Sequence, residues 1–92
     1  MMHLFMQLED KTEIVHSDIM NTKKGECVKV YIEKPILGGF QSAICYLPDY
    51  RWEGIEGFSD KDIEKYQEIL ESTAHLIIRF AKQGGLGNAA NI

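Results

Sequence analysis

Apolar and polar residues alternate in several separate stretches along the first half of the chain. Residues 2–8 carry an apolar side chain at every second position, which is the period of a β-strand. A polar break at 9–11 follows, and residues 12–16 are again rich in strand-forming types. We expect these two stretches to pair as a hairpin.

The clearest strand pattern lies at residues 27–33. Val28, Val30 and Ile32 fall on one face, so one side of this strand is predicted to be buried and the other at least partly wet. After a reversal at 35–39, residues 40–47 carry apolar side chains on both faces, which predicts a central or doubly covered strand. The sheet is therefore predicted to be antiparallel with four strands, or five if residues 51–55 form a short edge strand.

The period changes near residue 59, where a long helix is predicted at 60–83. Ser59 and Asp62 have the spacing of a capping box, with Asp in place of the usual Glu. Gly84 and Gly85 supply the stop. A helix of this length spans roughly 36 Å, whereas a seven-residue strand spans only about 23 Å. We expect the helix to extend beyond the sheet.

The second half of this helix is apolar around most of its circumference. The sheet can cover only one side of it, so we expect a second copy of the chain to cover the other. The predicted homodimer contact consists of Leu76, Ile77, Ile78 and Phe80.

The fold class predicted from these patterns is α+β, a β-meander followed by one long C-terminal helix packed on one face. At 92 residues, with 45% hydrophobic and 26% charged residues, the chain has the composition of one globular domain. We expect the domain at 1–83 and a flexible tail at 84–92. No apolar run approaches the ~20 residues that cross a membrane, and the first nine residues lack the basic leader of a signal peptide. Cys27 and Cys45 have no framework spacing, and free thiols suit the cytoplasm.

Catalytic and metal motifs are not evident in the pattern. His3, His16 and His75 form no closely spaced ligand pair, whereas a zinc site needs three or four converging ligands. The glycine pairs lie after strand-like or helical stretches, and a phosphate-binding loop must precede a helix. We therefore predict a protein that is not an enzyme and has no catalytic residue, no bound metal and no cofactor.

One segment concentrates charge. Residues 49–71 hold eight acids and three bases, so they carry −5 of a chain whose net charge is −4. This balance argues against nucleic-acid binding and favours a larger protein partner with a basic surface, such as a nucleic-acid-binding protein. Trp and Tyr often anchor such contacts. The predicted binding residues are Tyr50, Trp52, Glu53, Glu56, Asp60 and Asp62.

Several alternatives stay open on the sequence. The acidic segment could be solvated surface only, Trp52 could cover a small ligand or nucleotide, and an enzyme site could form across a dimer interface. The order of short strands followed by a helix is loosely similar to small antitoxin domains and phage-encoded inhibitors. That resemblance rests on element order alone, and it transfers no residue role.

Overall fold

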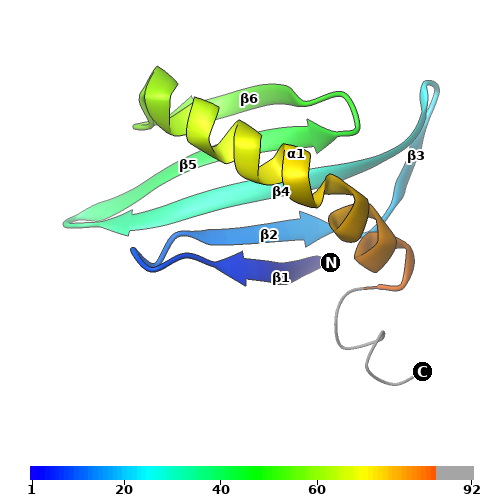
Figure 1. The fold of residues 1–92 in the computed structure, drawn as a ribbon, viewed down its shortest axis with the longest axis horizontal. Helices are drawn as coiled ribbons and strands as arrows, with labels where there is room; N and C mark the ends of the chain where they lie inside the picture. The colour runs from blue at the N-terminus through cyan, green and yellow to red at the C-terminus, as the bar shows by residue number, and fades with distance from the viewer. Residues whose placement is uncertain (85–92) are drawn as a thin grey trace.

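The computed structural model describes residues 1–84, which form one antiparallel sheet and one helix (Figure 1). The elements are β1 (Met2–Gln7), β2 (Glu13–Ser17), β3 (Met20–Thr22), β4 (Gly25–Ile36), β5 (Gly39–Leu47), β6 (Arg51–Glu56) and α1 (Asp60–Lys82). The predicted α+β arrangement, an antiparallel sheet followed by a C-terminal helix, is confirmed. The tail predicted at 84–92 lies outside the described residues except for Gly84.

The sheet is a meander in which each long strand pairs with its neighbour in sequence, in the order β1-β2-β4-β5-β6. The short strand β3 follows β2 after a break at Asp18 and Ile19, and it pairs with the first residues of β4. Thus β2 and β3 together line one side of β4, whose 12 residues make it the longest strand.

The helix begins as the sequence predicts. The Asp62 N–H donates to Ser59 Oγ at 3.2 Å, and the Ser59 N–H donates to Asp62 Oδ2 at 2.9 Å. This reciprocal capping box satisfies two donors that the first helical turn would otherwise leave free. The last helical residue is Lys82, and Gln83 caps the helix. Gly84 follows with a positive φ of 79°.

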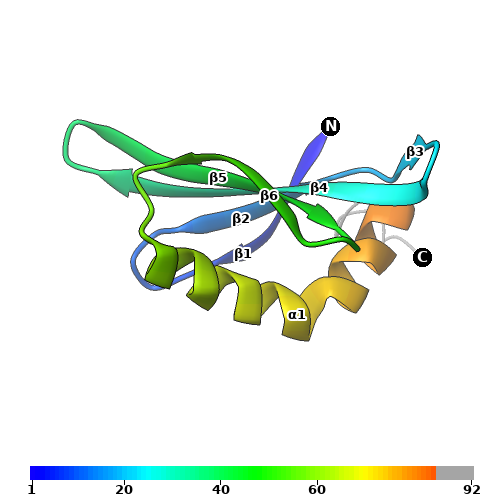
Figure 2. The same cartoon turned by 90° about the horizontal axis from the view of Figure 1, so that it is seen from above.

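One hydrophobic core lies between the helix and one face of the sheet (Figures 1 and 2). The predicted inward face of β4, Val28, Val30 and Ile32, is fully buried. The helix supplies a buried stripe at spacings of four and seven, and its members are Tyr66, Leu70, Ile77 and Ala81. Neighbouring strands add Ile14, Ala43, Cys45 and Leu47.

The expectation that the helix extends beyond the sheet assumed seven-residue strands, and that assumption is wrong. β4 has 12 residues, or about 40 Å, whereas the 23 residues of α1 span about 35 Å. The helix crosses the strands diagonally and bends toward the sheet in its second half (Figures 1 and 2). Near the bend, the hydroxyls of Ser72 and Thr73 both donate to the Ile69 carbonyl, at 2.9 and 2.7 Å. Such bonds commonly bend helices.

No helix within residues 1–84 is long and apolar enough to cross a membrane.

Candidate protein-binding surface

The helix covers one face of the sheet and leaves the other without any described element over it (Figure 2). We call this second side the helix-free face. Leu4 on β1 lies opposite Val15 on β2, which pairs in turn with Tyr31 on β4 and then with Ile44 on β5. Residues paired across strands share a face, so these four side chains form one line across four strands, the apolar row. Leu4 is 50% exposed, and the other three are partly exposed.

A line of carboxylates runs beside the apolar row, two residues further along β4. Glu13 on β2 lies opposite Glu33 on β4, and Glu33 continues through Ser42 to Glu56 on β6. We call Glu13, Glu33 and Glu56 the acidic row. Like charges directly opposite each other destabilise a sheet, and none of the ion pairs formed within residues 1–84 involves these three carboxylates.

Cationic side chains lie on the other side of the apolar row. Lys29 on β4 pairs with Tyr46 on β5, and Tyr46 pairs with Arg51 on β6. We call Lys29 and Arg51 the basic row. The Arg51 guanidinium carbon lies 4.4 Å from the centre of the Tyr46 ring, and its Nη1 donates to Glu53 Oε2 at 2.9 Å. Tyr46 also donates its hydroxyl to Glu53 Oε1 at 3.1 Å, so Arg51 is held in place on both sides.

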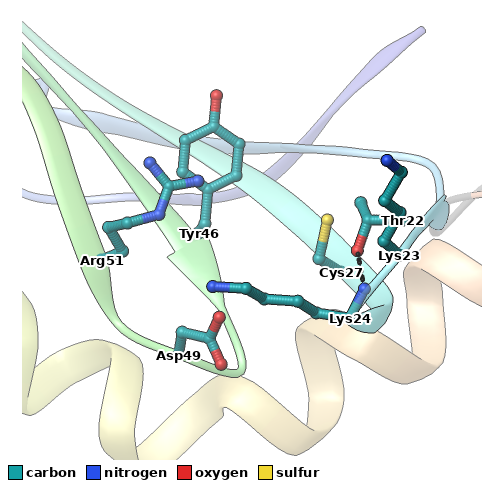
Figure 3. Close-up of a pocket in the computed structure, with 7 residues that line it drawn as sticks. All are labelled: Thr22, Lys23, Lys24, Cys27, Tyr46, Asp49 and Arg51. Carbon is teal, nitrogen blue, oxygen red and sulfur yellow. Dashed lines mark hydrogen bonds between the residues drawn. The ribbon is translucent and has the colours of Figure 1, made fainter.

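A hollow of about 310 Å³ opens next to the basic row (Figure 3). It is lined by Thr22, Lys23, Lys24, Cys27, Tyr46, Asp49 and Arg51. Three of these side chains are cations and one is an anion, so the hollow has a net positive lining. The aromatic ring of Tyr46 and the Cys27 thiol supply less polar wall.

The opposite end of the face carries an apolar projection. The β4–β5 hairpin extends beyond the rest of the sheet, and its tip turns away from the helix (Figures 1 and 2). We call Ile36, Leu37 and Phe40 the hairpin tip. Leu37 is fully exposed, Phe40 is 62% exposed and Ile36 is 45% exposed. Exposed apolar side chains gathered in this way commonly mark contact sites for other proteins.

The structure divides the six predicted binding residues between different surfaces. Tyr50 and Trp52 pack against the core on the helix side, where the Trp52 Nε1–H donates to Gln67 Oε1 at 2.7 Å. Glu53 and Glu56 lie on the helix-free face.

The two predicted aspartates lie at the start of the helix. Asp60 is exposed in the first turn. Asp62 closes the capping box, and the hydrogen bonds it accepts from Ser59 lower its pKa. Of the six residues, Glu53 and Glu56 are therefore the ones that share a face with the apolar row. A common contact through all six stays a prediction.

The four predicted dimer residues have contacts inside their own chain. Ile77 is fully buried in the core, and Ile78 packs against it beside Ile19 and Leu47. The Phe80 ring lies 6.1 Å from that of Phe5 on β1. Leu76 is half-buried. Because the bent helix closes onto the sheet, the chain itself covers much of this apolar half, and a dimer through these residues stays a prediction.

The cysteines lie on opposite faces of the sheet. Cys45 points into the core beside Val30, and burial raises the pKa of its thiol to about 12. Cys27 lines the hollow on the helix-free face. Both are free, and side chains on opposite faces cannot approach to disulfide distance. The Cys45 thiol is poorly suited to act as a nucleophile, because the thiolate is the reactive form.

Two histidines lie side by side on β1 and β2, with their ring centres 5.3 Å apart. His3 Nε2 is 2.7 Å from Asp18 Oδ1, and the buried His16 donates from Nδ1 to the Ser17 carbonyl at 2.8 Å. Across the described part of the chain, no three His, Cys, Asp or Glu side chains converge closely enough to hold a metal ion.

Sequence reasoning missed the rows because they depend on register. The alternation of β4 already placed Lys29, Tyr31 and Glu33 on one face, in the order cation, aromatic, anion. The alternation does not predict which residues of the neighbouring strands pair with these three positions, and those pairs form the rows.

The chain matches no protein-family model, no curated protein and no solved structure.

Proposed function

We propose that this protein is a non-enzymatic protein-binding module and that it contacts its partner through the helix-free face. The observation that carries the proposal is the apolar row, which runs uncovered across four paired strands between two rows of opposite charge. An apolar centre with a charged margin is the usual composition of a protein interface. Phe40, which pairs with Pro35 two residues beyond Glu33 on β4, extends the same surface into the hairpin tip.

The distribution of charge supports a partner with a basic contact surface. The segment at 49–71, which carries −5, reaches the helix-free face through Glu53 and Glu56. The acidic row continues this charge to β4 and β2. Complementary charge accelerates encounter and selects the partner, while buried apolar anchors supply affinity.

A small-ligand site under Trp52 is the alternative function, and it has less support. The indole N–H already has a partner in Gln67, and Trp52 packs against the core as a lid. None of the four cavities of the described chain that we compared is lined by Trp52.

Site-specific photocrosslinking tests the protein-binding proposal. A benzoylphenylalanine at position 31 keeps an aromatic side chain in the apolar row, and the same group at position 68 on the exposed side of the helix is the matched control. We expect protein adducts from position 31 and few from position 68 after irradiation in cells. Equal adduct yields from both positions would contradict the proposal.

A further inference from the structure

We propose that the occupant of the helix-free face is a second copy of this chain, packed face to face about a two-fold axis that runs along the apolar row. The inference rests on the proposed function and deepens it, because it identifies the basic partner surface as the chain's own basic row. It differs from a dimer through the helix, since the two surfaces lie on opposite sides of the sheet.

On β4, a cation and an anion lie at equal distances on the two sides of the apolar row. Lys29 precedes Tyr31 by two residues, and Glu33 follows it by two. Rotation about an axis along the apolar row keeps each strand above its own copy but reverses the direction along the strand. Lys29 of each copy therefore faces Glu33 of the other, and Arg51 faces the end of the acidic row that holds Glu56. These charges match twice, as a two-fold interface requires. Glu53, which pairs with Ile44 at the β6 end of the axis, faces its own copy, and its ion pair with Arg51 at 2.9 Å offsets the repulsion.

The same two-fold rotation also relates a projection and a hollow of the face, the hairpin tip and the hollow beside the basic row. Pro35, which pairs with Phe40 at the base of the hairpin tip, lies four residues after Tyr31. Cys27, which lines the hollow, lies four residues before it. The same rotation brings the hairpin tip of each copy over the hollow of the other. An apolar projection and a cavity of about 310 Å³ are thus at matching distances from the axis.

Charge also selects this axis over the alternative. A two-fold axis along the strands would stack the acidic row on itself and the basic row on itself, and like charges across an interface oppose association. The unrelieved Glu13–Glu33 pair fits the chosen orientation, because Lys29 of the second copy would bring a cation to it.

The size of the face is sufficient. The molecule measures 39 × 30 × 22 Å, and the sheet lies across its two longer dimensions (Figure 1). A standard interface buries about 800 Å² per partner, which a face of these dimensions can supply. Aligned packing of two twisted sheets at about 30° is a common arrangement.

A charge exchange tests the proposal directly. Lys29→Glu alone and Glu33→Lys alone should each weaken self-association of the full chain at least tenfold, because each places two like pairs in the interface. An equimolar mixture of the two single variants should form heterodimers. In such a heterodimer one chain carries carboxylates at both position 29 and position 33, and the other carries ammonium groups at both. Both facing pairs between positions 29 and 33 are then again of opposite charge.

With one of the two variants uniformly labelled with heavy nitrogen, native mass spectrometry resolves the three dimers of the mixture by mass. Lys65→Glu and Glu68→Lys, on the exposed side of the helix, form the control pair and should leave the homodimer intact.

Several results would overturn the inference. The first is a monomer mass for the unaltered chain at about 100 µM. A second is a dimer that both single variants leave unchanged while folding normally by circular dichroism. A third is a dimer that Leu76→Glu dissociates and the face variants do not, which would place the contact on the helix. If position 31 crosslinks to a different protein while the chain is monomeric, the proposed function stands and the self-association proposal falls.

Discussion

His16 is the residue whose chemistry the fold changes most clearly in the neutral pH range. Its side chain is fully buried, Nδ1 donates to the Ser17 carbonyl, and Nε2 has no hydrogen-bond partner in the described chain. Burial lowers its pKa, although the bond to Ser17 and the charge of Asp18 act in the opposite direction. The folded protein therefore keeps this imidazole neutral at a pH where the unfolded chain binds a proton.

This pKa shift predicts that stability decreases as the pH falls below about 6.5, the ordinary value for histidine. The unfolded state then binds more protons than the folded state, so the free energy of unfolding falls by at most about 1.4 kcal/mol per pH unit for this one group. Urea unfolding at several pH values between 7.5 and 5 measures the slope. His16→Leu should flatten it. An unchanged slope in the His16 variant would show that another group is responsible. Three carboxylates have lowered pKa values, and their protonation decreases the free energy of unfolding only below about pH 4. These are Asp10, Asp18 and Asp62.

At the scale of single elements, the sequence predicted what local chemistry determines. Ser59 and Asp62 define the start of the helix through a contact three residues apart, and the alternation around Val28 identifies the buried side of β4. The sequence did not predict β3, the length of the β4–β5 hairpin or the three rows. These depend on which residues pair across strands, and many of those pairs are distant in sequence, as Leu4 and Val15 or Tyr31 and Ile44 are.

The pairing of Glu13 with Glu33 leads to a prediction about the sheet itself. Two directly opposite carboxylates cost a sheet roughly 0.2–1 kcal/mol, so Glu33→Gln should raise the free energy of unfolding of the monomer by about that amount. The same change removes a charge that the proposed dimer uses, so it should weaken self-association. Urea unfolding of dilute protein measures the first effect, and sedimentation measures the second. Glu64→Gln on the exposed side of the helix is the control. Loss of monomer stability in the Glu33 variant would show that this carboxylate has a stabilising partner.

In the molecule as a whole, the one described helix covers one face of the sheet and leaves the other face open. The core uses one side of the sheet, and the bend of α1 brings much of the apolar second half of the helix against the sheet of the same chain. The helix-free face is a second apolar surface, and no described element covers it. The sequence could not indicate this, because Leu4, Val15, Tyr31 and Ile44 become one surface only once four strands are paired.

The hairpin tip and the charged rows should make separable contributions to binding. Leu37 and Phe40 are exposed and outside the core, so Leu37→Ser with Phe40→Ser should leave the melting temperature within about 4 °C, as expected of surface changes below ~0.5 kcal/mol. Lost burial of two apolar side chains should nevertheless weaken association at least tenfold, mainly through faster dissociation. The salt dependence should stay as it is in the unaltered chain, because that dependence comes from the acidic and basic rows.

Surface plasmon resonance at two salt concentrations separates these effects, with the immobilised chain binding the same chain in solution. Leu37→Met with Phe40→Tyr is the matched control, since it keeps most of the apolar area, and it should bind nearly as the unaltered chain does. Glu33→Lys should show the complementary pattern, with slower association and an altered response to salt. A tip variant that melts much earlier would mean that the hairpin stabilises the fold. A tip variant that binds normally would confine the contact to the rows.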